Sequence, residues 1–120
     1  MTKLTLFAVA AASLAAACKT GSPQQRTDIA NAMATTRDGL NGCYEMALAR
    51  NRRTPGGFVT VEFVAEAQTG RFKNVLIRRD EVNDPAVRMC VIQAVGSLKM
   101  AKPPDSNVTI AYAFRFTATD

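Results

Sequence analysis

The chain has 120 residues and a formal net charge of +5, with 48% hydrophobic and 21% charged residues. This length is enough for one domain, and the modest positive charge attracts anionic partners without requiring them. The sequence contains no histidine, so it lacks the commonest general acid–base residue and the commonest metal ligand. It also shows no phosphate-binding glycine loop or metal-ligand spacing. We therefore expect no enzyme activity, no cofactor and no catalytic or metal-binding residues.

Residues 1–17 have the pattern of an export signal. Lys3 supplies a positive charge, the run from Leu4 to Leu14 is apolar, and three alanines precede Cys18. The apolar run is too short to cross a hydrocarbon layer of roughly 30 Å. The alternative is an amphipathic or buried helix at the N-terminus, but the segment has no polar face after Lys3. The pattern predicts a signal peptide over residues 1–17.

The segment around Cys18, "LAAAC", resembles a bacterial lipobox, with Ala15 where that pattern usually has a larger aliphatic residue. Cleavage before Cys18 would leave a thiol that can be acylated. Ordinary cleavage after Ala17 would instead release a soluble periplasmic protein. We predict lipidation of Cys18, a polar tether over residues 18–27, and an outer membrane lipoprotein that faces the periplasm of a Gram-negative bacterium.

A first helix is predicted from Asp28, a residue type suited to the N-cap position, up to the arginines around Arg50. Its apolar positions recur at spacings of three and four, which is typical of one helix face. Gly39 and Gly42 weaken this helix and allow another element to approach closely. The residues of the face are Ile29, Met33, Thr36, Leu40, Cys43 and Ala47.

Two segments after this helix alternate between apolar and polar residues, which is typical of half-buried strands. The first, "FVTVEFVAEA", and the second, "RFKNVLIRR", are separated by the turn "QTG" and form a hairpin. Asp84 and Pro85 then begin a second helix. The segment "VTIAYAFRFT" forms a last strand with its aromatic residues on one face.

The predicted order is therefore α-β-β-α-β over a domain of residues 28–118. Every strand has one apolar face and every helix has one apolar stripe. The simplest arrangement that buries them all is an α+β fold, in which a three-stranded antiparallel sheet carries two helices on one face.

Cys43 and Cys90 lie on the apolar stripes of the two predicted helices. If both helices cover the same face of the sheet, the two side chains can meet, and an exported compartment permits a disulfide between them. Two buried free thiols are one alternative. A redox pair is another, although the chain has no Cys-x-x-Cys motif and no histidine.

These residues also carry a resemblance. Cys43-Tyr44-Glu45, Gly70 in the hairpin turn, Cys90-Val91, Pro103-Pro104 and the aromatic last strand resemble the TonB C-terminal-like domain, and in particular its AgmX/PglI type, over residues 28–117. The resemblance implies a module that binds a protein or peptide from the bacterial envelope by adding a strand beside the last strand. On this interpretation the peptide-binding edge comprises Thr109, Ala111, Ala113 and Arg115.

A second hypothesis is a structural or accessory role in a motility or secretion complex through a basic surface. The residues of that surface would be Arg50, Arg52, Arg53, Arg78 and Arg79. We expect partners to be an envelope protein or peptide, and a membrane reached through the lipid anchor, but no nucleic acid. Exposed sheet edges also allow a homodimer.

Overall fold

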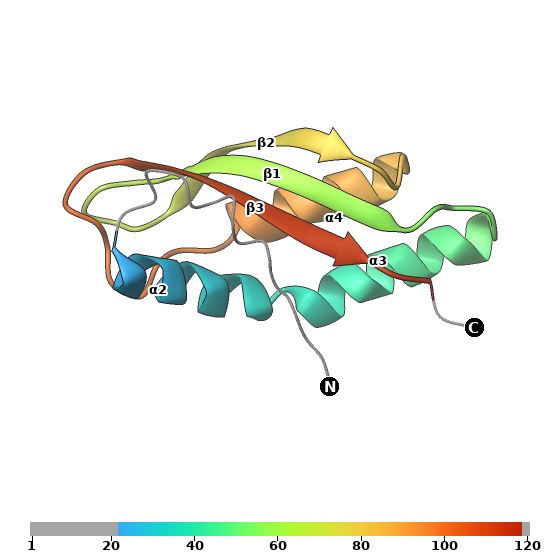
Figure 1. Ribbon diagram of the computed structural model, residues 1–120, viewed down its shortest axis with the longest axis horizontal. Helices are drawn as coiled ribbons and strands as arrows, with labels where there is room; N and C mark the ends of the chain where they lie inside the picture. The colour runs from blue at the N-terminus through green and yellow to red at the C-terminus, as the bar shows by residue number, and fades with distance from the viewer. Residues whose placement is uncertain (1–21, 119–120) are drawn as a thin grey trace.

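The computed structural model describes residues 22–118, so the predicted signal peptide and Cys18 lie outside the described residues. This part of the chain forms three helices and three strands (Figure 1). In chain order they are α2 (Pro23–Ala34), α3 (Arg37–Arg50), β1 (Gly57–Ala65), β2 (Phe72–Asp80), α4 (Pro85–Gly96) and β3 (Val108–Phe116).

The strands form one antiparallel sheet in the order β2-β1-β3, and the helices cover a single face of it (Figure 1). The central strand β1 turns every second residue into the core. Val59, Val61, Phe63 and Ala65 are all fully buried there, as their alternation predicts. Buried residues of all three helices join the same cluster, so the predicted α+β class is confirmed.

The first predicted helix is interrupted, so the observed order is α-α-β-β-α-β rather than α-β-β-α-β. The break falls at Thr35 and Thr36, whose hydroxyls donate to the carbonyls of Ala32 and Met33 at 2.6 and 2.7 Å. Threonine side chains can compete in this way with the backbone bonds that continue a helix. Two residues therefore separate the end of α2 at Ala34 from the start of α3 at Arg37, and the two helices run in different directions (Figure 1).

The first helix also begins earlier than predicted. Ser22 Oγ accepts from the backbone N–H of Gln25, and Gln25 Oε1 accepts from the N–H of Ser22, each at 3.1 Å. This reciprocal pair is a capping box, and Pro23 suits the first helical position. Asp28 is therefore not the N-cap, and residues 23–27 of the predicted tether belong to α2. In the described part of the chain, no helix combines the length and hydropathy that a bilayer span requires.

Two glycines in α3 do not serve the close packing that we expected. A Cβ atom built on Gly39 or Gly42 would meet nothing within 4 Å. Gly70, in contrast, has a φ of +76°, and a Cβ there would lie 2.9 Å from the carbonyl oxygen of Met100. Gly70 is therefore required by its surroundings, whereas no neighbouring group requires a glycine at position 39 or 42.

We therefore expect Gly42→Ala to stabilise the protein by about 1 kcal/mol, because alanine has the higher helix propensity and the site has room for the methyl group. Urea denaturation followed by circular dichroism measures the change. Gly70→Ala is the control and should destabilise the protein. A Gly42→Ala variant that unfolds at lower urea than the parent protein would contradict the packing described for α3.

Candidate functional site

β3 forms one edge of the sheet within residues 22–118. It pairs with β1 without a bulge, from Gly57 opposite Phe116 to Ala65 opposite Val108. The structure places the four residues of the predicted peptide-binding edge in one exposed row along this strand. They are Thr109, Ala111, Ala113 and Arg115.

The direction of the backbone groups follows from the start of β1. Phe58 donates its N–H to Glu81 Oε1 at 2.8 Å and accepts the N–H of Glu81 at 2.9 Å, so its backbone groups point away from β3. Backbone groups alternate in direction along a strand. Every second residue of β3, starting from the partner of Phe58, therefore turns its N–H and C=O toward the outer edge. These residues are Arg115, Ala113, Ala111 and Thr109.

The opposite edge, β2, is built differently. Its register with β1 shifts twice, once between Thr60 and Val61 and once between Glu62 and Val64, and Asn74 has a φ of +56°. β2 also ends in the charged sequence Arg78-Arg79-Asp80. Bulges and charges discourage a further strand from pairing at an edge. β3 has no bulge and only one charged residue, so it is the edge that can accept a strand.

A groove of about 450 Å³ runs between β3 and the helices beneath it. Its floor comes from the junction of α2 and α3, where the threonine break redirects the chain. Tyr112 and Phe114 face this groove from β3 and are only partly buried, with ring centroids 5.1 Å apart. The helix residues that line the groove are Met33, Arg37, Leu40 and Asn41.

The groove has a basic and an aromatic component. Arg37 and Arg115 both line it, and neither forms an ion pair with another residue in the range 22–118. The guanidinium of Arg115 lies 5.9 Å from the ring centroid of Phe58. Burial raises the pKa of the Tyr112 hydroxyl, and the positive charge of Arg37 acts in the opposite direction. A neutral phenol and two cations therefore line the groove at neutral pH.

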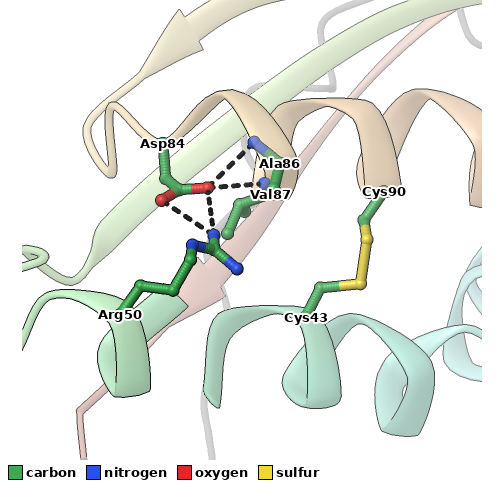
Figure 2. Close-up of a disulfide and its surroundings, with 6 residues drawn as sticks. All are labelled: Cys43, Arg50, Asp84, Ala86, Val87 and Cys90. Carbon is green, nitrogen blue, oxygen red and sulfur yellow. Dashed lines mark hydrogen bonds and ion pairs between the residues drawn. A yellow bond between two sulfur atoms is a disulfide. The ribbon is translucent and has the colours of Figure 1, made fainter. Parts of the chain in front are cut away.

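The position of α3, and so of one groove wall, is fixed by a covalent link. Figure 2 shows the disulfide between Cys43 on α3 and Cys90 on α4, whose Cα atoms are 6.6 Å apart. This distance lies in the usual range for a disulfide. The predicted pairing is confirmed, and it joins two helices that are packed on the same face of the sheet.

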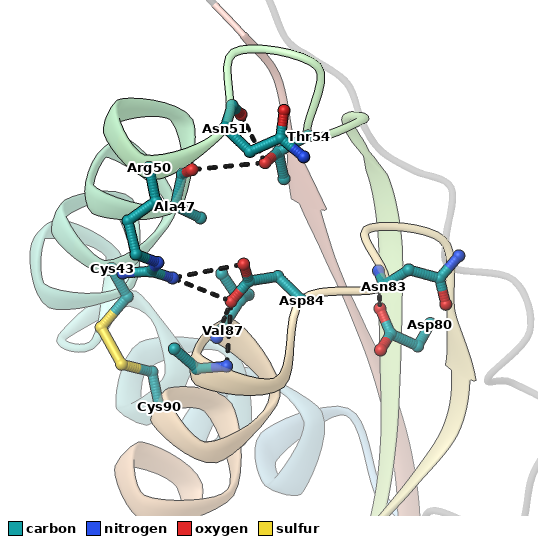
Figure 3. A network of polar contacts seen from close by, with 11 residues as sticks. Cys43, Ala47, Arg50, Asn51, Thr54, Asp80, Asn83, Asp84, Val87 and Cys90 are labelled. Atoms are coloured by element: carbon teal, nitrogen blue, oxygen red, sulfur yellow. Dashed lines mark hydrogen bonds and ion pairs between the residues drawn. A yellow bond between two sulfur atoms is a disulfide. The ribbon is translucent and has the colours of Figure 1, made fainter.

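An ion pair supports the same junction near the end of α3 (Figure 3). Arg50 Nη2 lies 3.2 Å from both carboxylate oxygens of Asp84, and Asp84 also accepts the N–H groups of Ala86 and Val87 at the start of α4. The N–H of Val87 first, and Arg50 second, lower the pKa of Asp84. The N-cap predicted at Asp84 is thereby confirmed, and the same carboxylate ties α4 to α3.

The predicted basic surface is partly neutralised in the structure. Arg50 pairs with Asp84, Arg78 with Glu62 and Arg79 with Glu81. Within the described residues, only Arg52 and Arg53 of this set form no ion pair. The partners of Arg50 and Arg78 are distant in the sequence, whereas Glu81 lies only two residues after Arg79. Three of the five arginines are therefore paired with carboxylates, and the surface is less positive than the sequence analysis predicted.

Sequence reasoning missed the groove. Tyr112 and Phe114 belonged to the predicted core-facing set, and their alternation could not show that they lie at an open edge. Arg37 and Asn41 carried no signal, because their role depends on β3, which lies more than sixty residues further along the chain. Among residues 22–118, no group of histidine, cysteine or carboxylate side chains could hold a metal ion.

Comparison with models of protein families, with curated proteins and with solved structures gives no match for this chain. The resemblance to the TonB C-terminal-like domain therefore rests on the motifs themselves and stays a prediction.

We expect removal of the disulfide by Cys43→Ala with Cys90→Ala to destabilise the protein by about 4 kcal/mol. The loop that it closes spans 47 residues, and closing such a loop restricts the unfolded chain. Urea denaturation with and without a thiol reductant measures the effect, and the reduced parent protein should match the double variant. If the oxidised and the reduced parent protein unfold at the same urea concentration, the disulfide does not stabilise the fold as described.

Proposed function

We propose that this protein is a non-enzymatic envelope lipoprotein whose domain binds an extended segment of a partner protein by strand addition to β3. The observation that supports the proposal most strongly is the difference between the two edges of the sheet. β3 is regular over Val108–Phe116 and carries one charge, whereas β2 has two register shifts and several charges. An edge with free N–H and C=O groups is the usual site of strand addition.

The groove gives such an added strand a place for its side chains. A strand beside β3 would lie roughly 4.8 Å further out, and alternate residues would point toward the helices. Those side chains would enter the groove next to Tyr112, Phe114 and Arg37. Backbone hydrogen bonds would then supply affinity, and the groove would select among sequences.

A binding role also suits the composition of the groove. No carboxylate, cysteine or histidine is among its lining residues. Apolar, aromatic and amide groups with two arginines can hold a peptide. The hydroxyls of Tyr112 and Thr117 also line the groove, but a hydroxyl is a weak nucleophile unless an adjacent base activates it.

The envelope location is supported by the sequence and by the disulfide. The segment before Cys18 has the pattern of an export signal, and disulfides persist mainly in oxidising compartments such as the periplasm. Lipidation of Cys18 remains part of the proposal. The mass of the mature N-terminus distinguishes an acylated Cys18 from ordinary cleavage after Ala17.

We expect Ala111→Pro to abolish capture of the partner from solubilised bacterial envelopes. The N–H of Ala111 points outward, so proline removes a donor offered to the partner and no donor used by β1. Arg115→Asp should reduce capture of an acidic partner. The readout is mass spectrometry of proteins recovered with each variant.

Ala111→Ser is the matched control, because it changes the same exposed side chain and keeps the N–H. It should recover the same partners as the parent protein. Circular dichroism and the presence of the disulfide establish that each variant is folded. If folded Ala111→Pro recovers the same partners in the same amounts, strand addition at β3 is wrong.

A further inference from the structure

The start of α2, which is the first described helix, lies at one end of the domain (Figure 1). Ser22, at the start of α2, lines a hollow together with Lys102, Pro104 and Asp105 of the loop before β3. The carbonyl of Pro104 also accepts the N–H of Gln68 in the hairpin loop at 3.1 Å. These three segments form one end of the molecule (Figure 1), which we call the entry end.

The entry end carries two cations in an unusual arrangement. Arg71 and Lys99 face each other in an isolated antiparallel bridge. The residues on either side make the backbone hydrogen bonds: Phe72 donates its N–H to the carbonyl of Leu98, and Met100 donates its N–H to the carbonyl of Gly70. Arg71 and Lys99 are therefore a non-hydrogen-bonded pair of an antiparallel bridge. Side chains in such a pair share one face and lie close together, and like charges there are destabilising.

The described part of the chain does not neutralise this pair. Both residues are exposed, and neither forms an ion pair within residues 22–118. The carboxylate of Glu66 is already hydrogen-bonded to Lys73 and Thr69, each at 2.7 Å. These bonds lower the pKa of Glu66, and the positive charge of Arg71 contributes to the same shift. An external anion would therefore relieve the repulsion between Arg71 and Lys99.

The length of the preceding chain brings this end close to the proposed anchor. Four peptide units separate Cys18 from Ser22, and a fully extended chain spans at most about 3.5 Å per residue. A lipid on Cys18 would thus hold Ser22 within about 14 Å of the headgroup layer. The molecule is 45 Å long. The connection between α3 and β1, which contains Arg52 and Arg53, lies at its other end (Figure 1).

We infer that the entry end is a membrane-contact surface, on which Arg71 and Lys99 bind the headgroups of an anionic lipid bilayer. The inference rests on the proposed function, because the lipid anchor on Cys18 would turn this end of the domain toward the membrane. The binding itself is attributed to the positive charges of Arg71 and Lys99. The inference places the lipid contact at the end of the molecule opposite Arg52 and Arg53, which belong to the predicted basic surface. Lys102 adds a third exposed cation at the same end, next to the carboxylates of Asp28 and Asp105.

Vesicle flotation tests the inference on the exported full chain carrying Cys18→Ser, which removes the acylation site. Vesicles of phosphatidylcholine alone are compared with vesicles that also contain phosphatidylglycerol. We expect preferential binding to the anionic vesicles, which is lost at high salt. Arg71→Gln or Lys99→Gln should each reduce this binding about fivefold, and the double variant should reduce it further. Inorganic phosphate at matched ionic strength should not displace the protein.

The matched control is Arg52→Gln with Arg53→Gln, which changes the net charge as much as the double variant of Arg71 and Lys99. It should leave flotation within twofold of the parent. No preference for anionic vesicles, an equal loss in the control, or displacement by phosphate would each overturn the inference. Vesicle flotation does not involve β3, so the two proposals can fail separately. If Ala111→Pro still recovers the partners, strand addition is wrong, but the membrane contact is unaffected.

Discussion

The covalent link between Cys43 and Cys90 is the constraint on which the rest of the structure depends. It holds α3 against α4 while α4 packs on the sheet, and the Arg50–Asp84 ion pair repeats the connection toward the end of α3. α3 begins beneath β3, so its position sets the width of the groove. A small domain has a limited core, and a cross-link of this kind supplies a large share of a stability of roughly 5–15 kcal/mol.

The two edges of the sheet divide the molecule into a protected side and an open side. The bulges of β2 absorb two extra residues, and the Glu62–Arg78 and Glu66–Lys73 pairs place charges along that side. β3 has neither feature, and its outer backbone groups stand above a groove lined by two arginines that lack a carboxylate partner in the described chain. In binding at β3, backbone hydrogen bonds would therefore supply the affinity and side-chain contacts in the groove would supply the specificity, as is general for strand addition.

Local patterns predicted much of the fold because each depends on neighbours in the sequence. The alternation of β1, the N-cap at Asp84 and the helical stripes of Cys43 and Cys90 are confirmed. The break at Thr35–Thr36 was missed because it depends on side-chain oxygens that compete with the helix backbone. The groove and the neutralisation of Arg50 could not be predicted, since both need partners that only the tertiary fold brings close.

Hydrogen exchange of the β3 amides tests strand addition most directly. In the protein alone, we expect fast exchange at the outer amides, because their N–H groups point outward, and slow exchange at the intervening residues bonded to β1. The outer amides are those of Thr109, Ala111, Ala113 and Arg115. In the complex captured from solubilised envelopes, the four outer amides should become protected. Outer amides that are already slow in the isolated protein, or that stay fast in the complex, would contradict the account.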